Sequence, residues 1–157
     1  MKRTSLKGAG CPIARSLDVI GDWWSMLIIR DALLGARRFG EFQKSLGLAK
    51  NILTVRLRAL VDQGILETAP ASDGSAYQEY RLTPKGRGVF PILVALRQWS
   101  EEFDARPEEI ATILVDKQTG RPVRKLELHS EDGRLLTPAD TALKPRPPAK
   151  QAKQITA

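Results

Sequence analysis

The chain has 157 residues, of which 42% are hydrophobic, and a formal net charge of +7. These values are typical of one compact domain plus an extension, and no apolar run reaches the roughly 18 residues that a membrane-spanning helix needs. A single cysteine excludes an internal disulfide, and no signal-type apolar segment follows the basic N-terminus, so we expect a cytoplasmic protein.

Apolar spacing near the N-terminus indicates a helical domain. Leucine, isoleucine and tryptophan recur every three or four residues, as in helices with one buried face. Proline stands at the start of the first such segment, where its missing N–H costs a helix little. Residues 1–10 lack this pattern, so we expect them to be disordered. The expected helices span residues 11–20, 24–34, 39–46 and 49–63.

The fourth expected helix has two different faces. Its apolar face repeats at i, i+4 and i+7 and consists of Leu53, Leu57 and Leu60. Its opposite face is polar and consists of Lys50, Asn51, Thr54 and Arg58. Side chains of these types hydrogen-bond phosphates and base edges, and a helix with such a front fits the major groove of DNA. The alternative is an ordinary amphipathic helix whose polar face is solvated.

A two-stranded hairpin is predicted directly after the fourth helix. Residues 65–69 and 77–82 have strand character, and the loop between them contains an Asp-Gly turn signal. Thr83-Pro84 is an N-cap and first-turn pair for a fifth helix, which Pro91 should kink or delay. A helix-turn-helix followed at once by a hairpin is a winged-helix module.

Beyond residue 106 the composition changes. Short apolar or alternating runs, separated by glycine turns, predict a small β-meander over residues 107–136. Residues 137–157 are rich in proline, alanine and lysine, so we expect a disordered basic tail. The predicted fold class is therefore mainly α, of the α+β type. It consists of a winged helix-turn-helix domain for DNA binding and dimerisation at residues 11–106 and a small C-terminal β extension.

Several blocks in a fixed order resemble the HxlR family of bacterial winged-helix transcription regulators. These blocks are Cys11-Pro12-Ile13 with Leu17, Ile20-Gly21 and Trp24, then Arg38-Phe39 with Glu41-Phe42, then Leu53 to Arg58 with Leu60 and Gly64, and finally Tyr80 to Arg87. The resemblance covers residues 11 to about 103. It implies a homodimer that binds double-stranded DNA at a two-fold operator, with one fourth helix in each of two successive major grooves. Repressor and activator roles both stay open.

The implied mechanism assigns candidate DNA contacts. Thr54 and Asn51 are expected at base edges, and Arg58 is expected at a guanine or a phosphate. The residues expected at backbone phosphates are Lys50, Arg37, Arg38 and Arg56, the last with a carboxylate such as Glu41 as its alternative partner. For each arginine taken alone, the alternative is a solvated or salt-bridged surface residue.

Two positions depart from the family pattern. Ala49 stands where the family often has a serine N-cap for the recognition helix, which costs roughly 1 kcal/mol of local helix stability. The expected wing tip, residues 72–76, has no lysine or arginine. This wing is therefore expected to touch DNA lightly or only through backbone groups.

The first and fifth helices have larger apolar faces than a small winged domain needs for its own core. The expected dimer contacts are Ile13, Leu17, Leu96, Trp99 and Phe103. Trp23 is expected to be exposed or to line a pocket. The alternative is that all three tryptophans lie in the core.

Cys11 is a candidate redox sensor. It precedes a helix start, where the helix dipole and free amide groups favour a thiolate, and in part of the family this cysteine responds to oxidants or electrophiles. The alternative is a buried structural thiol with no sensing role. A small-molecule effector is the other candidate signal.

Other classes of function have little support in the sequence. His129 is the only histidine, and no carboxylate pair, glycine-rich phosphate loop or metal-spaced cluster is present. We therefore expect no enzyme, no cofactor, no metal site and no membrane partner. The remaining alternative is a winged-helix protein-interaction module that does not bind DNA, which the bare wing tip and the modest charge of the folded part keep open.

Overall fold

A computed structural model describes residues 5–146 of the chain. It divides into two compact units, residues 1–110 and residues 111–157. Most of the expected basic tail, residues 147–157, lies outside the described residues. No helix in the described range combines the length and the apolar character needed to cross a membrane.

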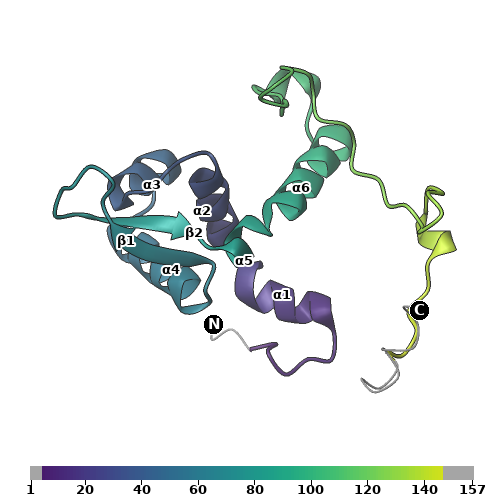
Figure 1. The fold of residues 1–157 in the computed structure, drawn as a ribbon, viewed down its shortest axis with the longest axis horizontal. Coiled ribbons are helices and arrows are strands. Elements are labelled where there is room, and N and C mark those ends of the chain that lie inside the picture. Colours follow the sequence, from purple (N-terminus) through teal and green to yellow (C-terminus); the bar gives the residue numbers. More distant parts are fainter. Residues whose placement is uncertain (1–4, 147–157) are drawn as a thin grey trace. The chain divides into compact units, whose positions relative to one another are not determined.

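The first unit contains the helices and the hairpin that the sequence predicts (Figure 1). Its helices are α1 (Pro12–Ile20), α2 (Trp23–Leu33), α3 (Phe39–Leu46), α4 (Lys50–Asp62), α5 (Pro84–Arg87) and α6 (Phe90–Phe103). Between α4 and α5, β1 (Leu66–Pro70) pairs antiparallel with β2 (Gln78–Leu82). The predicted fold class, a mainly α winged helix-turn-helix, is confirmed: α2, α3 and α4 form the helical body, and the hairpin is the wing.

Local signals set the ends of these helices. The Asp22 carboxylate accepts a hydrogen bond from the Ser25 backbone N–H at 3.0 Å and caps the start of α2. Gly47 has a φ of 63°, which lets the chain turn sharply from α3 into α4. Ala49 at the N-cap of α4 makes no side-chain cap bond, as the sequence predicts. The position of α4 therefore depends on packing more than on capping.

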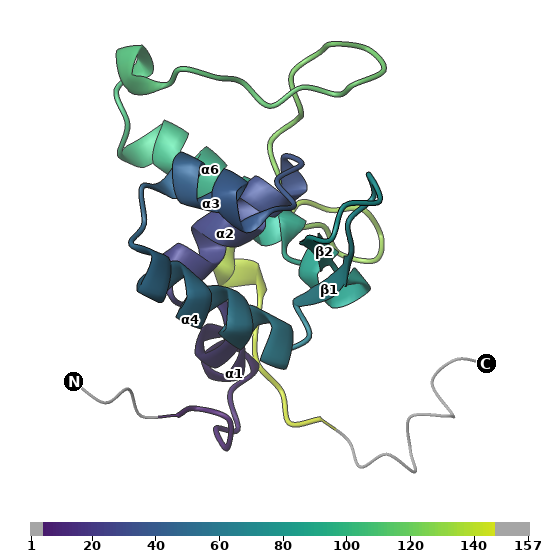
Figure 2. The ribbon, with the colours of Figure 1, turned by 90° about the vertical axis from the view of Figure 1, so that its left-hand side faces the viewer.

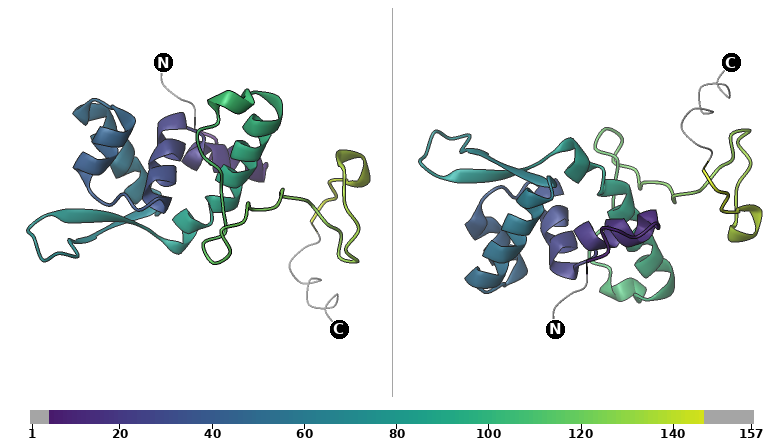
Figure 3. Two further views of the ribbon diagram at one scale, coloured as in Figure 1. Left: turned by 90° about the horizontal axis from the view of Figure 1, so that it is seen from above. Right: turned by 90° about the horizontal axis from the view of Figure 1, so that it is seen from below.

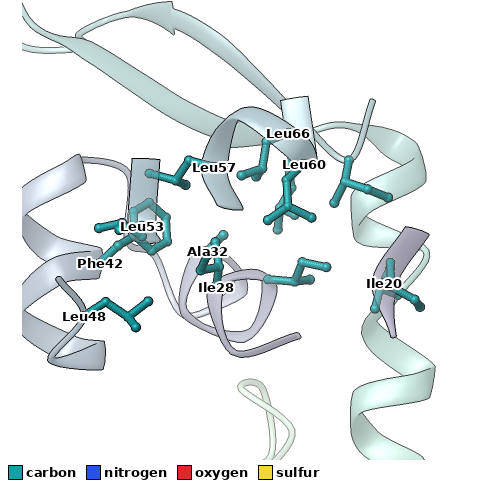
Figure 4. Packing of buried hydrophobic residues seen from close by; sticks show 13 residues of the cluster. Ile20, Ile28, Ala32, Phe42, Leu48, Leu53, Leu57, Leu60 and Leu66 are labelled. Atoms are coloured by element: carbon teal, nitrogen blue, oxygen red, sulfur yellow. The ribbon is translucent and has the colours of Figure 1, made fainter. Parts of the chain in front are cut away.

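An apolar core joins the helical body to the wing (Figure 4). The largest fully buried side chains are Ile28, Ile29, Phe42, Leu53, Leu57, Leu60, Ile65 and Leu66. The rings of Phe42 and Tyr80 meet edge to face with centroids 6.3 Å apart, which connects α3 to β2. The predicted apolar face of α4 thus lies in the core, as expected.

The recognition end and the α1–α6 end of the first unit are separate. Figure 1 shows α3, α4 and the tip of the wing on the left and α1 and α6 on the right, and Figure 2 shows α4 and the wing next to each other. In Figure 3 the wing tip points away from the helical body, on the side opposite α1 and α6. Contacts of α2 with both α1 and α6 connect the two ends.

The fifth predicted helix is interrupted. Its residues form α5 and α6, separated at Gly88 and Val89, and Pro91 lies in the first turn of α6. The predicted delay at Pro91 is confirmed, because a proline ring is tolerated in a first turn but not in a helix interior. A Cβ at Gly86 would lie 2.2 Å from the Ile65 carbonyl oxygen, so glycine is required where α5 packs against the start of the wing.

The second unit is less regular than the β-meander expected over residues 107–136. Its described part, residues 111–146, contains no strand, and none of its residues is buried. The isolated antiparallel bridges join Val115 to Pro122 and His129 to Leu135, and the short 3-10 helices of the C-terminal region are Pro107–Glu109 and Pro138–Asp140. Alternating apolar residues specify a sheet only where one face is covered, and nothing within this unit covers them.

Residues 5–10, part of the segment expected to be disordered, are held against α1. The Ser5 hydroxyl donates a hydrogen bond to the Asp18 carboxylate at 3.0 Å, and the Leu6 N–H donates to the same group at 3.1 Å. Two residues of the segment expected to be disordered thus have defined contacts with α1. Asp18 supplies an acceptor that the composition of residues 1–10 does not reveal.

Candidate nucleic-acid interface

The outward face of α4 is the principal candidate for DNA contact. Its polar residues, called here the recognition face, are all exposed, and they are Lys50, Asn51, Thr54 and Arg58. The leucines behind them are at most 1% exposed. Since residues of a helix are about 100° apart, these four side chains share roughly one quadrant of the helix surface. The helix therefore presents a polar rod to the outside while its back is locked in the core.

Three side chains of the recognition face have no protein partner. Those of Lys50, Asn51 and Arg58 make no hydrogen bond or ion pair with any residue that the structure describes. The Thr54 hydroxyl donates to the Lys50 carbonyl oxygen at 2.8 Å, and its methyl group and remaining lone pair stay available. These groups can therefore contact a ligand without first breaking a side-chain ion pair.

Arg56 lies outside this face and is paired with a carboxylate. Its guanidinium lies 3.2 Å from the Asp22 carboxylate, the group that also caps α2. The expected carboxylate partner, Glu41, instead accepts hydrogen bonds from the Arg37 and Arg38 backbone N–H groups at 2.6 and 2.9 Å, which hold the pKa of Glu41 below its ordinary value. The alternative of a carboxylate partner for Arg56 is thus correct in kind, but the partner is Asp22.

Arg37, an expected phosphate contact, is hydrogen-bonded to backbone carbonyl groups of its own chain. Its guanidinium donates to the carbonyl oxygens of Ala32 and Ala36, at 2.6 and 3.0 Å, and the residue is only partly exposed. These bonds satisfy carbonyl groups at the C-terminal end of α2, where positive charge is favoured. The structure therefore shows a helix-capping contact of Arg37, and its contact with phosphate stays a prediction.

Arg38 connects the helical body to the wing tip. Its guanidinium forms an ion pair with Asp73 and lies 5.9 Å from the centre of the Tyr77 ring. Hydrogen bonds from Ser75 and from Arg38 hold the pKa of Asp73 well below its usual range. The wing tip itself has no basic residue, so Arg38 is the cation beside it, and its charge is partly neutralised by Asp73.

Glu79 holds the wing loop from inside. It is 4% exposed, and its carboxylate accepts hydrogen bonds from the Ser72 N–H at 3.0 Å and from the Ser72 hydroxyl at 2.8 Å. Arg81 adds an ion pair at 3.1 Å. The bonds from Ser72, followed by the bond from Arg81, lower the pKa of Glu79 to about 2. The folded wing thus stabilises the ionised form of Glu79 over the protonated form.

This lowered pKa predicts acid sensitivity of the wing. Because the folded-state value lies below the unfolded value of about 4.3, Glu79 stabilises the fold fully above that value and loses its contribution as the pH falls toward 2. We expect Glu79→Gln to lower the urea midpoint at pH 7. Between pH 5 and pH 2.5 we expect the urea midpoint of this variant to decrease less than that of the wild type. Urea titrations of both proteins at several pH values measure this, with Glu67→Gln on exposed β1 as the control. An unchanged pH profile in Glu79→Gln would contradict this role.

Exposed apolar rows on α1 and α6 mark a second surface. All five expected dimer residues are exposed: Ile13 by 70%, Leu17 by 48%, Leu96 by 51%, Trp99 by 58% and Phe103 by 68%. Trp23 is 75% exposed, as expected, so the alternative that all three tryptophans lie in the core is wrong. Large apolar side chains in a continuous row are typical of a protein–protein interface.

Cys11 is the N-cap residue of α1 and carries a free, exposed thiol. The alternative of a buried thiol is therefore wrong for the isolated chain. Exposure makes the sulfur accessible to oxidants and to a second thiol.

The sequence of the first unit is similar to known regulators. The family model of the HxlR-like helix-turn-helix matches residues 19–108. An uncharacterised HTH-type transcriptional regulator of Mycobacterium tuberculosis is 41% identical over 99 residues, and the match covers 63% of this chain and 63% of the relative. The Bacillus subtilis regulator YdeP is 29% identical over 102 residues, which cover 64% of this chain and 80% of that protein. The chain thus spans less than two thirds of the mycobacterial relative.

Solved structures extend this similarity to three dimensions. The crystal structure of PA1607, described there as a candidate transcription factor, has a TM-score of 0.85 and 57% identity and covers 90% of this chain and 99% of that one. The oxidised form of the redox regulator HypR has a TM-score of 0.54 and 31% identity and covers 61% of this chain and all of HypR. The named relatives are described as transcriptional regulators, which is the class that the sequence predicts. The chain belongs to the HxlR-like helix-turn-helix family of transcriptional regulators.

Proposed function

We propose that this protein is a homodimeric regulator that reads a two-fold operator in double-stranded DNA through the recognition face of α4. The observation that carries the proposal is the outward polar face of a helix whose back is fully buried. In this arrangement Asn51 and Thr54 contact base edges, Arg58 contacts a guanine or a phosphate, and Lys50 contacts the backbone. Arg56 acts indirectly, since its ion pair with Asp22 fixes α4 against α2.

The α1 and α6 rows support the dimer. Two copies that share these rows about a two-fold axis bury the exposed tryptophan and phenylalanine side chains, which are typical interface anchors. A two-fold arrangement then presents two α4 helices to one duplex, with half-sites about 10–10.5 base pairs or a multiple apart. Arg38 supports the same binding mode, because phosphate can compete with Asp73 for its guanidinium.

Selection from random duplexes tests the proposed function. The full chain is expected to enrich an inverted repeat, and its affinity for that repeat is expected to fall steeply as salt rises. Sedimentation at the same protein concentration is expected to give a dimer. Enrichment of a single half-site by a monomer would contradict the two-fold part of the proposal.

One observation favours a second candidate, a winged-helix protein-interaction module without DNA binding. The wing tip carries Asp73 and no basic residue, so a phosphate backbone meets little positive charge there except Arg38. The same selection separates the two functions. Failure to bind any duplex at low salt, with the dimer intact, would favour the interaction module.

We further propose that Cys11 makes DNA binding sensitive to oxidants. The exposed thiol at the start of α1 and the structural similarity to a protein described as a redox regulator support this signal, and a small-molecule effector is the alternative. Diamide is expected to weaken operator binding of the unmodified protein by roughly 5–150-fold, the usual range of an allosteric coupling.

The matched variant for this prediction is Cys11→Ser, which keeps the size of the side chain. The Cys11→Ser variant is expected to bind the operator equally well with and without diamide. In the unmodified protein, dithiothreitol is expected to restore the operator affinity that diamide has lowered. Fluorescence anisotropy with labelled operator measures both. If Cys11→Ser still loses affinity on diamide treatment, the thiol is not the switch.

A further inference from the structure

The segment from residue 111 to residue 136, called here the arm, exposes apolar side chains that it cannot cover itself. Ile113 is 68% exposed, Leu128 is 72% exposed and Leu135 is 52% exposed. No described residue from 111 onward is buried, and isolated bridges are the only β pairing there. Even a complete two-stranded hairpin without a core is marginally stable in water, and single bridges contribute less. The arm therefore needs a surface outside its own unit.

The arm is an addition to the winged fold that recurs in a related structure. The PA1607 match covers 90% of the 157 residues, about 141, which is more than the 110 residues of the first unit. The HypR match takes in all of HypR but only 61% of this chain. The match with PA1607 therefore extends beyond the first unit into a segment that has no core of its own, which is typical of a segment tied down by another surface.

A groove on the first unit offers such a surface. It has a volume of about 430 Å³ and lies between α1 and the start of α6, and its apolar lining includes Pro12, Val19, Ile20, Val89 and Ile92. On the helical wheel of α1, Pro12 and Val19 lie roughly 100–160° away from Ile13 and Leu17. The groove therefore borders the expected dimer surface, and Ile92 belongs to both the groove and the exposed row of α6.

The exposed row of α6 places this groove next to a neighbour's arm. Ile92, Leu96, Trp99 and Phe103 follow i, i+4, i+7 and i+11 spacing and are all at least 44% exposed. If two such rows pack about a two-fold axis perpendicular to α6, the helices run antiparallel. Phe103 of one copy then lies near Ile92 of the other, since these two residues are roughly 16 Å apart along each helix. Each arm, which starts eight residues after Phe103, then begins beside the groove of the second copy.

Two basic residues lie among those that line the groove. Arg15 and Lys85 lie at the groove, and the Arg15 side chain has no partner among the described residues. In the arm, Glu127 and Glu131 flank Leu128, Glu127 lies 3.3 Å from the His129 ring, and the arm also contains basic residues. We propose that the arm of one copy docks its apolar side chains in the α1–α6 groove of a second copy, so that the dimer is clasped by exchanged arms. This inference rests on the homodimer of the proposed function.

Crosslinking between two distinguishable copies tests this exchange. One copy keeps Cys11, which precedes the groove residue Pro12, and carries a large tag. The other is untagged and combines Cys11→Ser with Ile113→Cys, Leu128→Cys or Leu135→Cys. After mixing and treatment with a short bismaleimide, at least one arm position is expected to give a mixed-size product, with Lys144→Cys as the control position.

A second protein that carries both Cys11 and the arm cysteine in one chain tests the alternative, in which the arm covers its own unit. If crosslinks form only within a chain that carries both Cys11 and the arm cysteine, the arm covers its own unit and the proposal is overturned. It is also overturned if no arm position crosslinks while the protein is a dimer. A wild-type protein that sediments as a monomer contradicts the homodimer itself, so failure of the dimer and failure of arm exchange are distinguishable.

A second measurement does not depend on crosslinker reach. Leu128→Arg is expected to raise the dimer dissociation constant at least tenfold in sedimentation equilibrium, because it places a charge in an apolar groove. The control is Leu34→Arg, since Leu34 is 79% exposed on the first unit and lies outside the groove. Equal dissociation constants for Leu128→Arg and wild type would refute the docking of Leu128.

Discussion

Replacing Phe42 by alanine is expected to lower the free energy of unfolding by about 3–5 kcal/mol. Phe42 is fully buried, and its ring lies between α3 and the wing, edge to face with Tyr80. Truncation removes this aromatic contact and leaves a cavity beside Leu53, the residue that holds the back of α4. The loss is large compared with the 5–15 kcal/mol that stabilises a typical domain.

Urea unfolding at a fixed protein concentration measures this loss, since dimerisation makes the midpoint depend on concentration. Phe42→Leu keeps most of the volume and is expected to cost less than half as much. Phe90→Ala makes the same truncation at a site that is 46% exposed and is expected to cost far less than Phe42→Ala. Equal losses for Phe42→Ala and Phe90→Ala would show that the ring of Phe42 is not a core element.

Operator binding of Phe42→Ala separates stability from recognition. At temperatures where the variant remains folded, it is expected to bind the operator with reduced affinity, because a cavity behind α3 loosens the support of α4. The recognition face is unchanged in this variant, so the salt dependence of binding should keep its slope. A changed slope would mean that the number of phosphate contacts depends on Phe42.

The helices and the recognition face could be predicted because their signals are local. The sequence spacing of Leu53, Leu57 and Leu60 fixes which side of α4 is buried, and the four polar residues then face outward by helical geometry alone. The bounds of α3, Phe39–Leu46, agree with the prediction for the same reason, since Gly47 ends that helix through its own backbone conformation.

The arginine partners could not be predicted because they depend on distant residues. Arg38 pairs with Asp73, 35 residues later, and Arg56 pairs with Asp22, 34 residues earlier. An exposed arginine next to a helix start looks the same in sequence whether it meets a phosphate, a carboxylate or a carbonyl oxygen. The inward turn of Arg37 toward α2 follows from the path of the loop, which no local pattern encodes.

The structure of the second unit could not be predicted from the sequence for a different reason. Alternating apolar residues between 113 and 136 carry a strand signal, but a strand forms only where a neighbour pairs with it and a surface covers one face. Within the described part of the unit neither condition is met beyond single bridges. If these apolar residues contact a second copy, the sequence carries a strand-like apolar pattern although the single chain forms no strand there.

Replacing Arg58 by alanine is expected to weaken operator binding by about 1–3 kcal/mol, which is roughly 5–150-fold. Arg58 is exposed on the recognition face and has no partner among the described residues, so the free protein should lose little stability. If its guanidinium binds a guanine, Arg58→Ala relaxes the preference at one operator position. If it binds a phosphate, affinity falls on all sequences and the salt slope decreases by about one.

Three comparisons make the Arg58 prediction decisive. Arg15→Ala removes the same charge from α1 and, measured above the dimer dissociation constant, is expected to bind the operator like wild type. Arg58→Lys keeps the charge but not the bidentate geometry, so it should restore phosphate binding and leave guanine recognition impaired. Titrations with the operator and with single-base variants, each at several salt concentrations, give affinity, specificity and slope together. Three buried leucines hold the back of α4 in the core, so the helix cannot turn to present another face. If Arg58→Ala binds every duplex with wild-type affinity, this face of α4 does not lie on DNA.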